Sequence, residues 1–186
     1  VLTDIGLEVE GVEEVESIQG GLKGIVIGYV KTCEPHPDSD HLSVTTVDLG
    51  TGTDAQIVCG ASNVAAGQKV LVAPVGTTLY TPEGETFEIL RRKIRNIYSE
   101  GMICSEDEIG LGNDHSGIVV LPEDAPLGKQ AREYYDINSD FVYEIGLTPN
   151  RPDCTGVRGI ARDLAAAGLG TLKPEPELRA VEGDYE

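Results

Sequence analysis

Aromatic side chains are scarce in this sequence, which contains no tryptophan, two phenylalanines and seven tyrosines among 186 residues. Proteins that hold unpaired nucleic-acid bases stack them on exposed aromatic rings. Between residues 21 and 133, the rings available for such stacking are Tyr29, Tyr80, Phe87 and Tyr98. Any contact of that kind is therefore expected to be weak or auxiliary.

Long apolar runs are missing as well. The longest ones, such as residues 117–121, are far too short to cross a bilayer. The first residues form neither a basic segment nor an apolar one, so they do not resemble a secretory signal. We therefore expect a cytoplasmic protein. Because there is no initiator methionine, we also expect the sequence to begin inside a longer chain.

The cysteines are widely scattered, with no Cys-x-x-Cys pair and no histidine at ligand spacing. A structural zinc site needs such clustering, so no metal site is predicted. The loop from His36 to His41 has two aspartates between its histidines, but it has no further anchoring ligand. Without a secretory signal, the cysteines are expected to be reduced and mostly buried. They are Cys33, Cys59, Cys104 and Cys154.

Catalytic signatures are also absent. The sequence has no phosphate-binding Gly-rich loop ending in Lys-Ser or Lys-Thr, and no Gly-x-Ser-x-Gly elbow. No Cys-His or Ser-His-Asp arrangement can be assigned from spacing. These absences favour a binding or structural module over an enzyme active site.

The net charge of −18 argues against a strong nucleic-acid partner. Proteins that bind nucleic acid tightly by themselves usually present a broad basic face. The cluster that breaks the acidic trend is Arg-Arg-Lys-Ile-Arg at residues 91–95. One basic cluster on an acidic chain predicts weak or auxiliary binding.

Short strand patterns, separated by turn signals, dominate the first two thirds of the chain. The predicted strands cover residues 24–33, 41–49, 56–59, 69–75, 87–89, 101–104 and 117–121. Ser105, followed three residues later by Glu108, is typical of a capping box at the start of a short helix. Several short strands with frequent turns predict a small closed or sandwich β-domain.

The pattern changes after residue 130. Residues 143–147 predict a strand, and a Pro-rich polar loop follows it. A helix is predicted from about residue 155 to 167, with Asp153 as its N-cap and Gly168 at its end. Its apolar residues fall at helical spacing, which predicts one buried face. They are Val157, Ile160, Ala161 and Leu164.

Four stretches resemble the signatures of EMAP-type tRNA-binding domains. Residues 36–44 read His-Pro-Asp-Ser-Asp-His-Leu-Ser-Val, and residues 56–64 read Gln-Ile-Val-Cys-Gly-Ala-Ser-Asn-Val. Residues 67–70 and 99–105 also match, and all four follow the family's order. The resemblance implies an oligonucleotide-binding (OB) barrel. Two departures from the pattern are His41, which replaces the usual cation, and Asn96, which replaces a usual glycine.

The flanks are similar to the sequence around that barrel in the beta subunits of bacterial phenylalanyl-tRNA synthetases. They include residues 5–13, residues 147–154 (Leu-Thr-Pro-Asn-Arg-Pro-Asp-Cys) and residues 158–163. The resemblance therefore implies an N-terminal fragment that is mainly β with α+β flanks. An OB-type barrel at residues 21–133 would be inserted into a small α/β domain. The two pieces of that domain would be residues 1–20 and 134–186, the second ending in a truncated linker.

The same resemblance implies a role in an α2β2 ligase that activates phenylalanine with ATP and magnesium and then esterifies tRNA. In that family the catalytic site belongs to the alpha subunit, and the editing site lies beyond this segment. We therefore expect no catalytic residue and no cofactor in this chain. Its expected partners are tRNA, the alpha subunit and the remainder of the beta subunit, with no membrane.

Candidate tRNA-binding residues are cations of the basic cluster and polar residues at matched motif positions. Lys93 and Arg95 are the leading candidates for phosphate contact. The others are Arg91, Arg92, Asn63, Ser99, Glu100, Ser105 and His41. Candidate residues for an interface with the rest of the synthetase are Arg151, Arg158 and Arg162.

Each of these residues also has a structural interpretation. The cations can belong to a strand whose charged side chains simply face solvent, and the Asn and Ser residues can cap turns and helices. The chain can therefore be an auxiliary tRNA-binding module, or an architectural domain that packs against synthetase subunits and barely touches RNA. A free-standing, self-associating barrel is disfavoured by both flanks.

Overall fold

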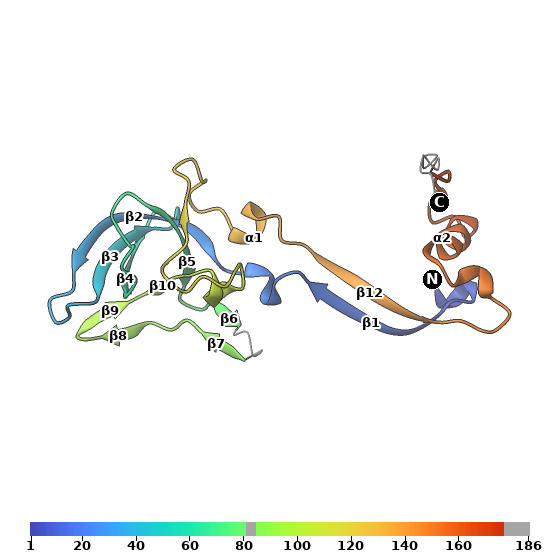
Figure 1. Cartoon of the computed structure of the whole chain (residues 1–186), viewed down its shortest axis with the longest axis horizontal. Helices are drawn as coiled ribbons and strands as arrows, with labels where there is room; N and C mark the ends of the chain where they lie inside the picture. Colours follow the sequence, from blue (N-terminus) through green and yellow to red (C-terminus); the bar gives the residue numbers. More distant parts are fainter. Residues whose placement is uncertain (81–84, 177–186) are drawn as a thin grey trace, which may run out of the picture. The chain divides into compact units, whose positions relative to one another are not determined.

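A computed structural model describes residues 1–80 and 85–176 (Figure 1). Contacts divide the chain into two compact units, one formed by Val1–Glu14 with Phe141–Glu186 and the other by Val15–Asp140. The sequence placed the corresponding boundaries after residues 20 and 133. The end of the predicted linker, beyond residue 176, lies outside the described residues.

The larger unit is built on one antiparallel sheet (Figure 1). Its strand order is β10-β5-β2-β3-β4, and β11 also pairs with β5. These strands are β2 (Val26–Pro35), β3 (Ser43–Asp48), β4 (Asp54–Cys59), β5 (Lys69–Pro74), β10 (Gly101–Ile103) and β11 (Val120–Leu121). Each of them overlaps a strand that the sequence predicted.

Hydrogen bonds between β4, the last strand of this order, and the residues just before β10, the first strand, bend the sheet into a nearly closed barrel. The Glu100 amide donates to the Gln56 carbonyl at 2.8 Å. The hydroxyl of Ser99 accepts the Val58 amide at 3.1 Å. This arrangement has the OB-type architecture, so the predicted fold class is confirmed.

Strand β5 separates two hydrophobic cores, which explains its continuous apolar sequence. Val70 and Val72 lie in one core, and Leu71 and Ala73 lie in the other; all four are fully buried. Close packing also requires Gly28 on β2, where a Cβ would stand 2.8 Å from methyl groups of both Val47 and Val72. All four cysteines are free thiols, and three of them are buried, as the sequence predicted.

Shorter elements surround the barrel. Two small hairpins pair β6 (Thr78–Tyr80) with β7 (Thr86–Glu88), and β8 (Arg92–Ile94) with β9 (Ile97–Ser99). Single turns of helix occur at η2 (Gln19–Leu22), η3 (Asp107–Ile109) and α1 (Ala131–Tyr134). The sequence did not predict the β8–β9 hairpin, which carries most of the basic cluster.

The smaller unit contains most of a two-stranded sheet, in which β1 (Glu8–Glu16) pairs with β12 (Ser139–Gly146). Its remaining elements are η1 (Thr3–Ile5), η4 (Pro152–Cys154) and α2 (Val157–Ala166). Leu7 and Cys154 are its fully buried apolar residues among those described.

The helix α2 forms where the sequence predicted it, but two expectations about it were wrong. None of its residues is fully buried: Ile160, Ala161 and Leu164 are half-buried, and Val157 is 86% exposed. Gly156 occupies the N-cap position with no side-chain cap. Asp153 does not cap the helix because its carboxylate binds arginine side chains instead.

Candidate nucleic-acid interface

The basic cluster forms a hairpin whose two faces differ. In β8 and β9, Arg92 lies opposite Ser99, and Lys93 lies opposite Tyr98. Successive side chains of a strand point to opposite faces, so Arg92 and Lys93 face different surroundings. The connecting residues Arg95 and Asn96 have φ values of 42° and 71°, as a two-residue hairpin turn requires.

One face of the hairpin holds a stack of cations on a tyrosine ring. The Arg91 guanidinium lies 4.3 Å from the centroid of the Tyr98 ring, and the Lys93 ammonium lies 6.0 Å from it. Arg91 also forms an ion pair with Glu100 at 2.9 Å. The positive charge of Arg91 is thus largely balanced within the protein, whereas no carboxylate pairs with Lys93 among residues 1–80 and 85–176.

The other face of the hairpin borders a cleft of about 620 Å³. Its lining is mostly apolar, with polar and charged side chains among the apolar ones. Lining residues include Leu42, Val58, Phe87, Leu90, Met102, Ile103 and Ile118, together with Glu88, Arg92, Ile94, Ser99, Ser105, Glu108 and His115. Phe87 is 40% exposed. Apart from the imidazole of His115, its ring is the aromatic one among the described lining residues.

Arg92 is the candidate cation that lines the cleft. Its side chain is exposed, and within the described part of the chain no ion pair holds it. A guanidinium on the rim of an apolar cleft can bind a phosphate while a flat base covers the floor. The position of Arg92 therefore suits single-stranded nucleic acid better than a rigid duplex.

The tip of the hairpin contacts the loop formed by residues 36–42. The Arg95 guanidinium donates to the Asp38 carbonyl at 2.8 Å, and the Asn96 amide donates to the Asp38 carboxylate at 3.4 Å. Nε2 of His36 lies 3.3 Å from the Ile94 carbonyl. The sequence placed His36 in a polar loop, but its side chain is buried, with 3% exposed. No sequence signal identified this role.

Two of the polar candidates brace the barrel. The Asn63 side chain donates to the Ile118 carbonyl and accepts the Ile118 amide, both at 3.0 Å, as a paired strand would. Ser99 is buried; its hydroxyl accepts the Val58 amide and donates to the Gly101 carbonyl at 2.9 Å. These hydrogen bonds use the side-chain amide of Asn63 and the hydroxyl of Ser99, which would otherwise be available to bind a base.

Ser105 and Glu108 form half of the predicted capping box. The Ser105 amide donates to the Glu108 carboxylate at 2.8 Å. The Ser105 hydroxyl donates to Asp107 instead of accepting from a helix amide, and this bond, followed by that of His115, lowers the pKa of the Asp107 carboxyl. His41 remains exposed, and the described residues give its ring no hydrogen-bond partner.

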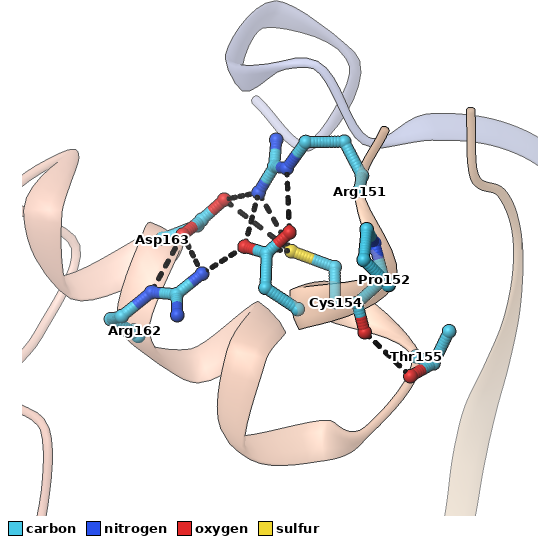
Figure 2. Close-up of polar contacts among 7 residues, drawn as sticks. Arg151, Pro152, Cys154, Thr155, Arg162 and Asp163 are labelled. Carbon is cyan, nitrogen blue, oxygen red and sulfur yellow. Dashed lines mark hydrogen bonds and ion pairs between the residues drawn. The ribbon is translucent and has the colours of Figure 1, made fainter. Parts of the chain in front are cut away.

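The candidate interface arginines of the smaller unit are engaged with carboxylates, and Figure 2 shows the contacts of Arg151 and Arg162. Arg151 contacts Asp153 at 3.2 Å and also pairs with Asp163 on α2, while Arg162 pairs with both aspartates. Hydrogen bonds from Arg151 hold the pKa of both carboxyls below the usual range. Arg158 pairs with Glu175 at 3.0 Å. An interface role for these arginines stays a prediction.

Asp153, Cys154 and Asp163 are also the described residues that come close enough to suggest a metal site. Their ligand atoms lie within 4.8 Å of one another. The guanidiniums of Arg151 and Arg162 already bind both carboxylates, and Figure 2 shows that the Arg151 guanidinium also contacts the Cys154 sulfur. A cation would have to displace those arginines, so the cluster is an ion-pair network that joins η4 to α2.

Within the described part of the chain, no helix combines the length and the apolar character that crossing a membrane requires. Residues 25–130 match the family model described as "Putative tRNA binding domain". The crystal structure of a MetRS related protein from Pyrococcus horikoshii is also similar, at 21% identity and a TM-score of 0.41. That similarity covers 57% of this chain and 87% of the solved one.

Curated relatives extend the similarity beyond the barrel. The phenylalanine–tRNA ligase beta subunit of Porphyromonas gingivalis is 61% identical over 166 residues, which is 89% of this chain and 20% of the relative. That of Novosphingobium aromaticivorans is 49% identical over 93% of this chain and 21% of its own length. This chain thus spans about a fifth of the length of these relatives. The chain belongs to the tRNA-binding domain family, and within that family it is similar to phenylalanine–tRNA ligase beta subunits.

Proposed function

We propose that the cleft beside the β8–β9 hairpin binds tRNA as an auxiliary contact of a phenylalanine–tRNA ligase. The observation that carries this proposal is the position of Arg92, an exposed cation without an ion pair among residues 1–80 and 85–176, on the rim of an apolar cleft. A phosphate would bind Arg92, and an unpaired base would cover the cleft floor. Membership of the tRNA-binding domain family supports the same assignment.

The contact is weak in this proposal, because a single unpaired cation in the cleft lining offers little counterion release and the chain carries a net charge of −18. The whole enzyme would supply the remaining affinity. Activation of phenylalanine with ATP and magnesium, and its transfer to tRNA, would occur elsewhere in an α2β2 assembly in the cytoplasm. This chain would contribute no catalytic residue.

A second candidate function is architectural packing within the synthetase. The observation that favours it is that two residues at matched motif positions, Asn63 and Ser99, form their side-chain hydrogen bonds within the barrel. An architectural barrel would need those residues as much as an RNA-binding barrel does.

Equilibrium binding of fluorescently labelled tRNA to this chain, at about 50 mM and about 200 mM salt, separates the two functions. The proposal expects binding that weakens as salt rises. Arg92→Ala should reduce the slope of log K against log salt by about 0.7 to 0.9, the value for one phosphate contact. Absence of binding even at the lower salt concentration would refute an autonomous RNA contact and favour the architectural role.

A further inference from the structure

The tip of the β8–β9 hairpin is attached to loop 36–42 by side chains from both segments. His36 and Asp38 belong to the loop, and Arg95 and Asn96 belong to the hairpin turn. We name this set of four residues the loop–hairpin contact. It joins segments that lie more than fifty positions apart in the sequence.

Both ring nitrogens of His36 are used in this contact. Nδ1 accepts the amide of Asp38 at 3.0 Å, which leaves the proton on Nε2 to donate to the Ile94 carbonyl at 3.3 Å. Because the side chain of His36 is buried, it cannot touch a ligand in the cleft. Any effect of His36 on binding must therefore pass through other residues.

Arg95 is oriented in the same way, toward the protein. Its backbone adopts a left-handed conformation, and its guanidinium donates to the main-chain oxygen of Asp38. The sequence made Arg95 a leading candidate for phosphate contact, but this bond uses one of the guanidinium N–H donors on the loop instead of on a phosphate. Arg95 thus differs from Arg92, whose guanidinium has neither a hydrogen bond nor an ion pair with another residue that the structure describes.

The hairpin is attached to the barrel at its base, where the Ser99 hydroxyl accepts the Val58 amide, but its own pairing is short. Each of its strands is three residues long, and a two-stranded hairpin is at best marginally stable in water. A side chain that must be ordered on binding costs affinity. An external attachment at the tip would remove part of that cost for Arg92.

We propose that His36 and Arg95 are positioning residues, which hold the hairpin tip on loop 36–42 and thereby fix Arg92 at the rim of the cleft. This inference rests on the proposed function of the cleft. It assigns Arg95 to the protein framework instead of to a phosphate. It also gives the buried His36 a part in RNA affinity without RNA contact.

The variant His36→Asn tests this role most cleanly. An asparagine Oδ1 can still accept the Asp38 amide, as Nδ1 of histidine does, but the shorter side chain cannot reach Ile94. The variant therefore keeps the loop turn and loses the bond to the hairpin. Arg95→Ala removes the second attachment. Thr45→Val is the matched control, because it also loses one buried hydrogen bond, from Thr45 to Ile57, away from the cleft lining.

Two measurements are needed on each variant of the full chain: amide hydrogen exchange in β8 and β9, and tRNA affinity as a function of salt. We expect His36→Asn and Arg95→Ala each to accelerate exchange in the hairpin and to weaken tRNA binding by about twofold to tenfold, the range for one net hydrogen bond. The salt slope should stay at its wild-type value in His36→Asn. Thr45→Val should lower thermal stability without a selective change in the hairpin.

Three results would overturn the inference. The first is unchanged hairpin exchange in both variants. The second is a loss of salt slope in Arg95→Ala as large as that in Arg92→Ala, which would make Arg95 a phosphate contact. The third is accelerated hairpin exchange with unaltered tRNA affinity. Failure of the proposed function gives a different result, because the wild-type chain would then not bind tRNA whatever the exchange data show.

Discussion

The guanidinium of Arg95 donates a hydrogen bond to the main-chain oxygen of Asp38 at 2.8 Å, although the two residues are 57 positions apart in the sequence. This bond divides the basic cluster into cations with different surroundings. Arg91 is paired with Glu100, Arg95 is attached to loop 36–42, and Arg92 lies at the cleft. Membership of the basic cluster therefore does not by itself predict which cation would contact RNA.

Arg92→Ala and Lys93→Ala form a matched pair, because they remove equal charge from opposite faces of one hairpin. We expect Arg92→Ala to weaken tRNA binding and to lower the salt slope by about 0.7 to 0.9, whereas Lys93→Ala should change the slope much less. Salt titrations of the binding constant measure both effects. The reverse order would mean that RNA lies on the face with Tyr98 and not in the cleft.

Phe87 is the ring on which a base could stack within the cleft. Phe87→Leu keeps an apolar side chain opposite Leu79 but removes the aromatic face. We expect a loss of about 1 kcal/mol in tRNA binding free energy, with an unchanged salt slope, because stacking does not release counterions. Equal affinities of the variant and the wild type would show that no base reaches Phe87.

Ser99 tests whether a matched motif position serves the barrel or the RNA. Its buried hydroxyl joins the Val58 amide to the Gly101 carbonyl, so Ser99→Ala leaves two buried groups without that partner. We expect the free energy of unfolding to fall by about 1 to 3 kcal/mol, as denaturant titration would measure. The salt slope of tRNA binding should not change. A stable variant with lost RNA binding would instead assign Ser99 to the ligand.

The barrel could be predicted from the sequence because its signals are local. Alternating residues in β2 and β3 and the apolar run in β5 have strong patterns, and turns rich in Gly, Pro and Asp separate them. The β8–β9 hairpin escaped prediction because its turn is Arg95-Asn96, which lacks the glycine that usually marks such turns. Asn tolerates the left-handed conformation, and attachment to Asp38 holds Arg95 in it.

The candidate site was harder to predict, since its roles depend on contacts distant in sequence. Asn63 meets Ile118, and His36 meets Ile94, at separations that no local pattern reveals. Burial of the apolar face of α2 was predicted from helical spacing alone. Spacing shows that a helix is amphipathic, but it does not show whether the described chain contains a surface to cover it.

The ion pairs between η4 and α2 should depend on pH. Hydrogen bonds from Arg151 lower the folded-state pKa of Asp163 below the unfolded value of about 4. A depressed folded-state pKa contributes stability above the unfolded value, and that stability is lost as pH falls through the folded value. We therefore expect amide chemical shifts of residues 151–155 to change only in strong acid.

The variant Asp163→Asn should reproduce that change at neutral pH, because it removes the charge that Arg151 and Arg162 bind. Asp124→Asn, which alters an exposed aspartate of the other unit, is the control. An Asp163 carboxyl that titrates at the ordinary aspartate pKa would contradict the network.

The central claim is that the cleft beside β8–β9 binds tRNA, and chemical-shift mapping of this chain tests it most directly. At low salt, added tRNA should shift amides of cleft-lining residues, foremost Leu42, Gly60, Arg92 and Ile118. Arg92→Ala should weaken those shifts at equal tRNA concentration. Shifts confined to residues outside the cleft lining, or no shifts at any concentration reached, would contradict the claim.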